Sequence, residues 1–119
     1  MVVDLLTRER LSESEADRVF KALADTTRRD ILARAIEREQ SVSALARRYE
    51  MSLTAVQKHV AVLERAALVS KQRSGREARV AANPETLRKA ATLLAAFEQQ
   101  WIERATKIAE ILAEEDAGT

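Results

Sequence analysis

The scarcity of residues that interrupt regular structure is the strongest constraint on this chain. Its 119 residues include only two glycines and one proline. A β-sandwich or barrel needs turn residues about every ten positions, and this sequence does not supply them. Alanine, leucine, glutamate, arginine and lysine are abundant instead, a composition typical of helices. With 46% hydrophobic and 33% charged residues, the chain predicts one mainly α-helical globular domain over residues 1–119.

Residue types that are absent or rare exclude several kinds of site. The chain has no cysteine and one histidine, His59, which excludes disulfides, thiolate chemistry and zinc sites built from several histidines. Aromatic residues make up 3%, too few for a platform that stacks single-stranded nucleic acid. No glycine-rich phosphate loop or Ser-His-carboxylate set is evident, so we expect no enzyme and no cofactor. No apolar run is long enough to span a membrane, and residues 1–10 hold no signal-peptide core, so the expected location is the cytoplasm.

Apolar residues at helical spacing predict the first two helices. The first helix is placed at residues 14–24, and residues 1–13 are either an N-terminal arm or its extension. Ser12 and Glu15 have the spacing of a capping box, with Ser14 as a competing cap. The second helix begins after the capping residue Asp25, and its expected buried stripe contains Ile31, Leu32, Ala35 and Ile36.

Two short capped helices in succession form the central motif, residues 41–66. Ser41 caps a helix of about two turns, and Ser52 caps a second helix after a turn of about three residues, which is the layout of a helix-turn-helix. The expected apolar face of the second helix contains Val56, Val60, Leu63 and Ala67. Its exposed face presents Thr54, Gln57, Lys58 and Ala61.

The pattern changes after this motif. Residues 68–82 read as a β-hairpin around Ser74-Gly75, the only sheet that we expect. Pro84 then begins a final helix, residues 84–113, whose apolar residues follow a heptad rhythm that Arg104 interrupts. Such a helix spans about 45 Å, too long for a compact domain of about 13 Å radius to cover. Part of it should therefore face a partner helix, while residues 114–119 should fray.

Positive charge is concentrated in the middle of the chain. The net charge is +1, but residues 41–80 carry eight cations against three anions, which leaves −4 for the remainder. This distribution indicates a localised anionic partner, although ordinary solvated helix faces would also account for it.

Four stretches of the sequence resemble one family. They are Phe20-Lys-Ala-Leu-Ala-Asp-Thr-Thr-Arg-Arg-Asp-Ile-Leu32, Val42-Ser-Ala-Leu-Ala46, Met51-Ser-Leu-Thr-Ala-Val-Gln-Lys-His-Val60 and Val62-Leu-Glu-Arg-Ala-Ala-Leu-Val69. Together they are similar to the ArsR/SmtB-type bacterial transcriptional repressors, in the branch without cysteine. Three residues depart from the usual family pattern: Thr26 stands for proline, Gln57 for serine and Ala67 for glycine.

The resemblance implies a winged helix-turn-helix of about five helices and a two-stranded hairpin wing, dimeric through its N- and C-terminal helices. It implies a homodimeric repressor that binds an imperfect palindrome in double-stranded DNA, with recognition helices about 34 Å apart. The candidate DNA-binding residues are Arg47, Arg48, Ser52, Leu53, Thr54, Gln57, Lys58, His59, Arg73, Arg76 and Arg79. The candidate dimer residues are Phe20, Leu94, Phe97, Trp101 and Ile108.

Each of these assignments has a structural alternative. Ser52 could serve only as a cap, and His59 could be a boundary histidine that packs on the helix after Ser41. The cations could be solvated, and the aromatic residues of the last helix could pack within one subunit. The sequence favours neither a metal sensor nor a thiol switch, and it leaves the effector open. The alternative function is a helical protein-interaction module on the same scaffold, without specific DNA binding.

Overall fold

The computed structural model describes residues 10–118. Capping side chains fix where its first two helices begin. Helix α2 spans Glu13–Leu23 and α3 spans Thr26–Glu37. Ser12 is the cap of α2, because its Oγ accepts from the Glu15 N–H and Glu15 Oε1 accepts from the Ser12 N–H at 2.9 Å. The competing cap Ser14 therefore lies within the helix. Most of the expected arm, residues 1–9, lies outside the described part of the chain.

The helix-turn-helix consists of α4, Val42–Arg48, and α5, Leu53–Arg65. Ala67 was expected on the buried face of α5, but it is exposed and lies beyond the helix, and Ala66 is buried in its place. The reason is the backbone: Ala67 has φ +58°, a left-handed conformation that ends the helix. The usual family residue there is glycine, which adopts this conformation without steric strain.

Replacing Ala67 by glycine is therefore expected to stabilise the protein. A left-handed backbone conformation costs a residue with a Cβ about 1 kcal/mol, and glycine does not have this cost. Urea unfolding should show a higher free energy for Ala67→Gly. The matched change Ala66→Gly should lower it, because Ala66 has a right-handed backbone, φ −81°, and is buried. Equal effects at both positions would contradict the strain argument.

The sheet has three antiparallel strands in the order β1-β3-β2: β1 Gln40–Ser41, β2 Val69–Ser74 and β3 Glu77–Ala82. The hairpin belongs to the one sheet found in residues 10–118, as expected, but that sheet has a third strand, β1, which was not expected. Strand β1 is two residues long, too short to show an alternating pattern. It pairs because the α3–α4 connection lies beside β3, with Gln40 opposite Val80 and Ser41 opposite Arg79.

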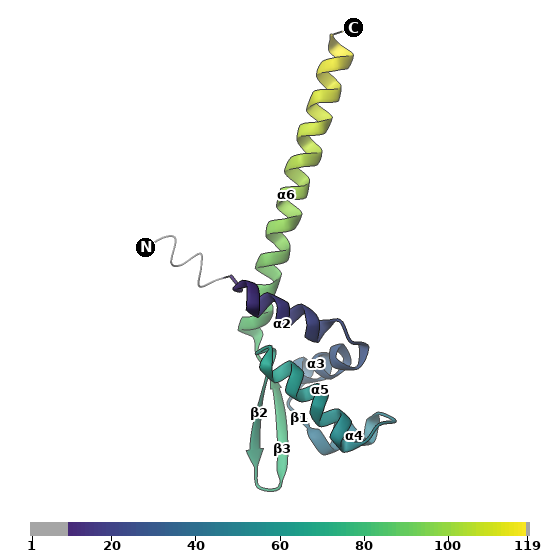
Figure 1. Ribbon diagram of the computed structural model, residues 1–119, viewed down its shortest axis with the longest axis vertical. Coiled ribbons are helices and arrows are strands. Elements are labelled where there is room, and N and C mark those ends of the chain that lie inside the picture. The colour runs from purple at the N-terminus through teal and green to yellow at the C-terminus, as the bar shows by residue number, and fades with distance from the viewer. Residues whose placement is uncertain (1–9, 119) are drawn as a thin grey trace, which may run out of the picture.

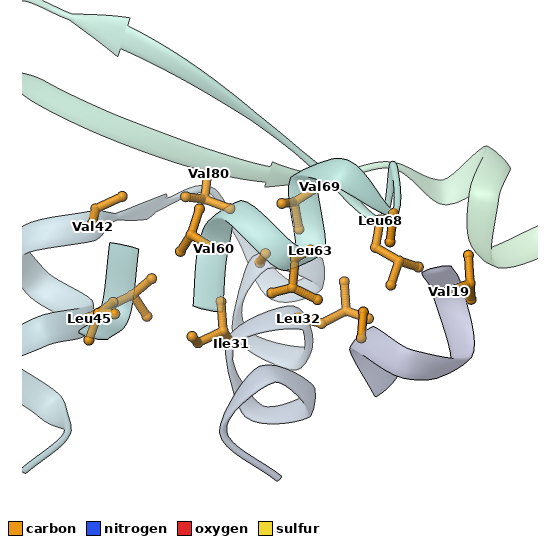
Figure 2. Close-up of a cluster of buried hydrophobic side chains, with 14 of the residues drawn as sticks. Val19, Ile31, Leu32, Val42, Leu45, Val60, Leu63, Leu68, Val69 and Val80 are labelled. Carbon is orange, nitrogen blue, oxygen red and sulfur yellow. The ribbon is translucent and has the colours of Figure 1, made fainter. Parts of the chain in front are cut away.

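The core lies where α2, α3 and α5 meet the sheet (Figure 2). Its largest fully buried side chains are Val19, Ile31, Leu45, Val56, Val60, Leu63, Leu68, Val69 and Val80. Ile36, which was expected in a buried stripe, is 57% exposed, and the candidate dimer residue Phe20 is 37% exposed. Helix α5 and strand β3 contact α3 and cover Ile31 and Leu32, whereas Ile36 lies at the edge of that stripe in the last turn.

Helix α6 spans Pro84–Ala117 and projects away from the rest of the molecule (Figure 1). Its 34 residues correspond to about 51 Å. Ala90 is its only buried residue among those described. The expected helix end at residue 113 was wrong, because α6 continues to Ala117. Alanine and glutamate favour helix, and no glycine interrupts α6 before Gly118.

Candidate nucleic-acid interface

Helices α4 and α5 and the β2–β3 hairpin lie together at the end of the molecule opposite the free end of α6 (Figure 1). The sequence-predicted DNA-binding residues come from these elements and the turn between α4 and α5. The fold therefore places two separate basic stretches, residues 47–58 and 71–79, at one end.

The start of α5 is anchored by its cap. Ser52 Oγ accepts from the Ala55 N–H at 3.1 Å, so the capping role of Ser52 is present in the structure. Val56 and Val60 face the core and are fully buried. The opposite side of the helix is exposed and presents Leu53, Thr54, Gln57 and Lys58.

A contact with α3 holds the C-terminal end of α4. The Tyr49 hydroxyl donates a hydrogen bond to Asp30, which also accepts from Arg34 Nε at 2.8 Å. These hydrogen bonds, that of Tyr49 foremost, hold the pKa of the Asp30 carboxyl below its usual value. Arg47 and Arg48 are exposed in the last turn of α4, where a helix favours positive charge.

The hairpin presents its cations unequally. Gly75 makes the tight turn with φ +63°, and Arg73 and Arg76 beside it are exposed. Arg79 differs, because its Nε lies 2.5 Å from Glu39 Oε1 and its Nη1 lies 3.3 Å from Glu77 Oε2. A phosphate would have to compete with two carboxylates for the Arg79 guanidinium.

The polar contacts of His59 are with the start of α3, whereas the neighbour considered from the sequence was the helix after Ser41. Its Nδ1 lies 3.3 Å from Arg28 Nη1 and 3.8 Å from Asp25 Oδ2, and its side chain is 22% exposed. Asp25 also caps α3 by accepting from the Arg28 N–H, which lowers the pKa of the Asp25 carboxyl. The histidine thus joins α5 to the α2–α3 corner.

Sequence reasoning gave no role to Arg28 and Arg29. Arg28 donates to the backbone oxygens of Ala22 at 2.9 Å and Lys21 at 3.0 Å, and Arg29 donates to that of Leu23 at 2.7 Å. These carbonyls lie in the last turn of α2, where carbonyl groups have no N–H four residues on within the helix, and that of Lys21 also accepts from the Ala24 N–H at 3.3 Å. The Arg-Arg pair that begins three residues after the cap Asp25 was the available signal, but only the fold shows which carbonyls it reaches.

The candidate dimer residues are exposed in the single chain. Leu94, Phe97, Trp101 and Ile108 of α6 are between 48% and 70% exposed. Large side chains exposed in a row are unusual in a monomer. This helix therefore offers an apolar surface at a distance from the helix-turn-helix.

The described residues show no group of three or more His, Cys, Asp or Glu side chains placed to hold a metal ion. No helix among them combines the length and apolar character needed to cross a membrane.

Comparison with known proteins gives consistent matches. A family profile described as a helix-turn-helix domain matches residues 23–72. The uncharacterized HTH-type transcriptional regulator YuzN of Bacillus subtilis (strain 168) is 39% identical over 79 residues, which cover 60% of this chain and 86% of YuzN.

Solved structures agree with this match. An ArsR-like transcriptional regulator from Rhodococcus sp. RHA1 superposes with a TM-score of 0.73 at 37% identity, over 82% of this chain and 92% of that protein. The homodimeric winged helix-turn-helix DNA-binding domain of Mb0332 from Mycobacterium bovis superposes with a TM-score of 0.59 at 26% identity, over 72% and 81%.

Proposed function

Because this chain belongs to the ArsR family of winged helix-turn-helix transcriptional regulators, we propose that it is a homodimeric repressor that binds an imperfect palindrome in double-stranded DNA. Repression would follow from occupation of a promoter by the dimer. Family membership alone does not specify three parts of this proposal. They are the palindromic operator, repression rather than activation, and the residues that contact DNA.

One observation carries the proposal. Six cations at the α4–α5–hairpin end are exposed, and none has an ion-pair partner within residues 10–118. They are Arg47, Arg48, Lys58, Lys71, Arg73 and Arg76. Cations that no carboxylate neutralises are available to displace counterions from DNA phosphates. Arg79 is the weakest candidate of the set, since Glu39 and Glu77 already hold it.

Base reading is assigned to the exposed face of α5. A recognition helix contacts base edges with residues near its N-terminus, and Thr54, Gln57 and Lys58 are exposed there. Gln57 can make paired hydrogen bonds to adenine, which the usual serine cannot. We assign His59 to orientation of α5 through Arg28 rather than to direct base contact, because its ring is largely covered.

Dimerisation is assigned to α6 with a contribution from Phe20 of α2. The relative Mb0332 is described as homodimeric. Burial of the exposed apolar residues of α6 against a second copy would remove them from water, which is favourable. Two-fold pairing would present two recognition helices to two half-sites of a palindrome.

The regulatory signal proposed is neither a metal ion nor a thiol oxidation. The chain has no cysteine and one histidine, and soft or borderline metal ions select those ligands. A small organic molecule, a protein partner or control of abundance would fit this residue set.

The test is selection of bound sites from a random duplex library, followed by titration of the enriched site at two salt concentrations. We expect a palindrome whose affinity falls steeply with salt. If no sequence is enriched and the residual binding vanishes at moderate salt, a protein-interaction module becomes the better description.

Removal of two cations is expected to weaken DNA binding without changing the dimer. The double change Lys58→Ala with Arg76→Ala should cost about 1–3 kcal/mol of binding free energy and reduce the salt dependence by about one counterion per cation. Fluorescence anisotropy against the selected site measures both. The control is Arg10→Ala with Arg88→Ala, two exposed cations outside α5 and the hairpin. Equal losses in both proteins would refute the contact assignment.

A further inference from the structure

Four cations gather where α2, the end of α5 and the start of α6 come together (Figure 1). They are Arg18 and Lys21 of α2, Arg65 of α5 and Lys89 of α6. We call these four residues the cation cluster. Helices α2 and α5 contact each other, so the fold brings together positive charges that lie far apart in the sequence.

The cation cluster lines two hollows in the surface. Arg18 and Arg65 line both, so the hollows adjoin. The larger has a volume of about 130 Å³ and is also lined by Lys21 and the half-buried Val62. The smaller has a volume of about 70 Å³ and is also lined by Lys89. The larger hollow exceeds several-fold the space that one water molecule needs, which leaves room for a small polyatomic anion.

No carboxylate neutralises the cation cluster. None of its members forms an ion pair within residues 10–118, and no acidic residue is among the described residues that line the larger hollow. Glu15 lines the smaller one, but its Oε1 accepts from the Ser12 N–H at 2.9 Å. The hydrogen bonds of Ser12 lower the pKa of the Glu15 carboxyl, and the charges of Lys89 and Arg18 lower it further. The region therefore favours negative charge.

The proposed DNA and dimer contacts do not account for these cations. Arg65 is twelve positions after Leu53, the first residue of α5, which is about 18 Å along the helix. It is thus remote from the residues assigned to base reading. Arg18 and Phe20 are two positions apart in α2, or about 200° around the helix. Arg18 therefore lies on a different side of α2 from the candidate dimer residue.

We propose that the cation cluster binds the phosphate group of a small organic phosphate. Arginine donates paired hydrogen bonds to phosphate oxygens, and lysine adds a compact positive charge. A phosphate monoester carries up to two negative charges and three free oxygens, so it can contact cations from α2 and α5 together. A carboxylate has one charge and two oxygens, and it would leave more of the cluster unneutralised.

The position of the site gives the ligand a regulatory role. Arg65 ends α5, the helix assigned to base reading, whereas Arg18 and Lys21 belong to α2. A phosphate held by both helices is expected to alter the orientation of α5 and hence the affinity for the operator. This role rests on the proposed function and identifies the chemical class of the effector. Linkage is reciprocal, so DNA and phosphate should change each other's affinity by the same factor.

Titration of the full-length ¹⁵N-labelled chain with inorganic phosphate tests the site. At constant ionic strength, set with sodium chloride, we expect saturable NMR shifts at Arg18, Val62 and Arg65. Arg18→Gln with Arg65→Gln should weaken phosphate binding at least tenfold, because two charge-assisted contacts are lost. The control Arg38→Gln with Arg88→Gln removes two exposed cations that line neither hollow and should leave the affinity unchanged.

Two further comparisons define what binds and where. Acetate, the probe for a carboxylate, should bind the cluster at least tenfold more weakly than phosphate, since it carries less charge. Lys58→Ala with Arg76→Ala removes cations of the DNA-facing end and should keep phosphate binding at the cluster. Acetate binding as tight as that of phosphate would overturn the assignment of the ligand class.

Operator affinity tests the regulatory role. In fluorescence anisotropy at constant ionic strength, saturating phosphate should change the affinity of the unchanged chain for the selected site threefold or more. The same addition should have no effect on Arg18→Gln with Arg65→Gln. Without phosphate, this variant should bind the operator as tightly as the unchanged chain, because the cluster does not face DNA.

The outcomes that overturn the inference differ from those that overturn the proposed function. Absence of saturable shifts at Arg18 and Arg65, or equal weakening in the control variant, removes the site. If Arg18→Gln with Arg65→Gln loses operator affinity without phosphate, the cluster contacts DNA instead. Saturable binding with an unchanged operator affinity removes the regulatory role. If no operator is enriched at all, the repressor fails while the phosphate titration still decides the site.

Discussion

Replacement of Trp101 by alanine is expected to dissociate the proposed dimer and, with it, to remove most of the operator affinity. Trp101 is 70% exposed in the single chain, although burial of an aromatic side chain removes 150–250 Å² from water. Large aromatic residues near the centre of an interface commonly contribute 2 kcal/mol or more. We therefore expect the dimer dissociation constant to rise about 100-fold, which corresponds to about 3 kcal/mol.

Analytical ultracentrifugation over a range of concentrations measures this change. The matched control is Ile36→Ala, which removes a side chain of comparable exposure, 57%, from α3. That variant should remain as dimeric as the unchanged chain. An intact dimer in Trp101→Ala would remove Trp101 from the interface and leave the other apolar residues of α6 to be tested.

Replacement of Leu63 by alanine is expected to cost about 3 kcal/mol of folding free energy. Leu63 is fully buried in the core cluster (Figure 2), and a buried leucine-to-alanine change costs 2–5 kcal/mol because a cavity remains. A domain of this size has only 5–15 kcal/mol in total. Urea unfolding followed by circular dichroism measures the loss.

Leu53 provides the control on the same helix. It is 46% exposed at the start of α5, so Leu53→Ala should change the folding free energy by less than about 0.5 kcal/mol. Because Leu53 belongs to the candidate DNA-binding set, its variant should lose operator affinity while it remains folded. Comparable unfolding curves for the two variants would mean that the assignment of buried and exposed faces of α5 is wrong.

The helices and the hairpin that form the candidate site could be predicted from the sequence. The side-chain contacts between them could not. Ser52 predicts the start of a helix, and Gly75 predicts a tight turn, because capping and turn preferences depend only on neighbouring residues. The pairing of Arg79 with Glu39 joins residues 40 positions apart, and that of His59 with Arg28 joins residues 31 positions apart. No sequence interval encodes either distance. Two residues interpreted as DNA ligands therefore proved to have partners within the protein.

The sequence by itself determined the local structure of this protein. Capping residues, apolar periodicity and the near absence of glycine and proline specify where each helix begins, because those preferences act within a few residues. Only the tertiary structure decided that Gln40 and Ser41 form a third strand, that Ala67 is exposed, and that Ile36 lies outside the core. These outcomes depend on which elements lie side by side, and that is a property of the packed chain rather than of any segment.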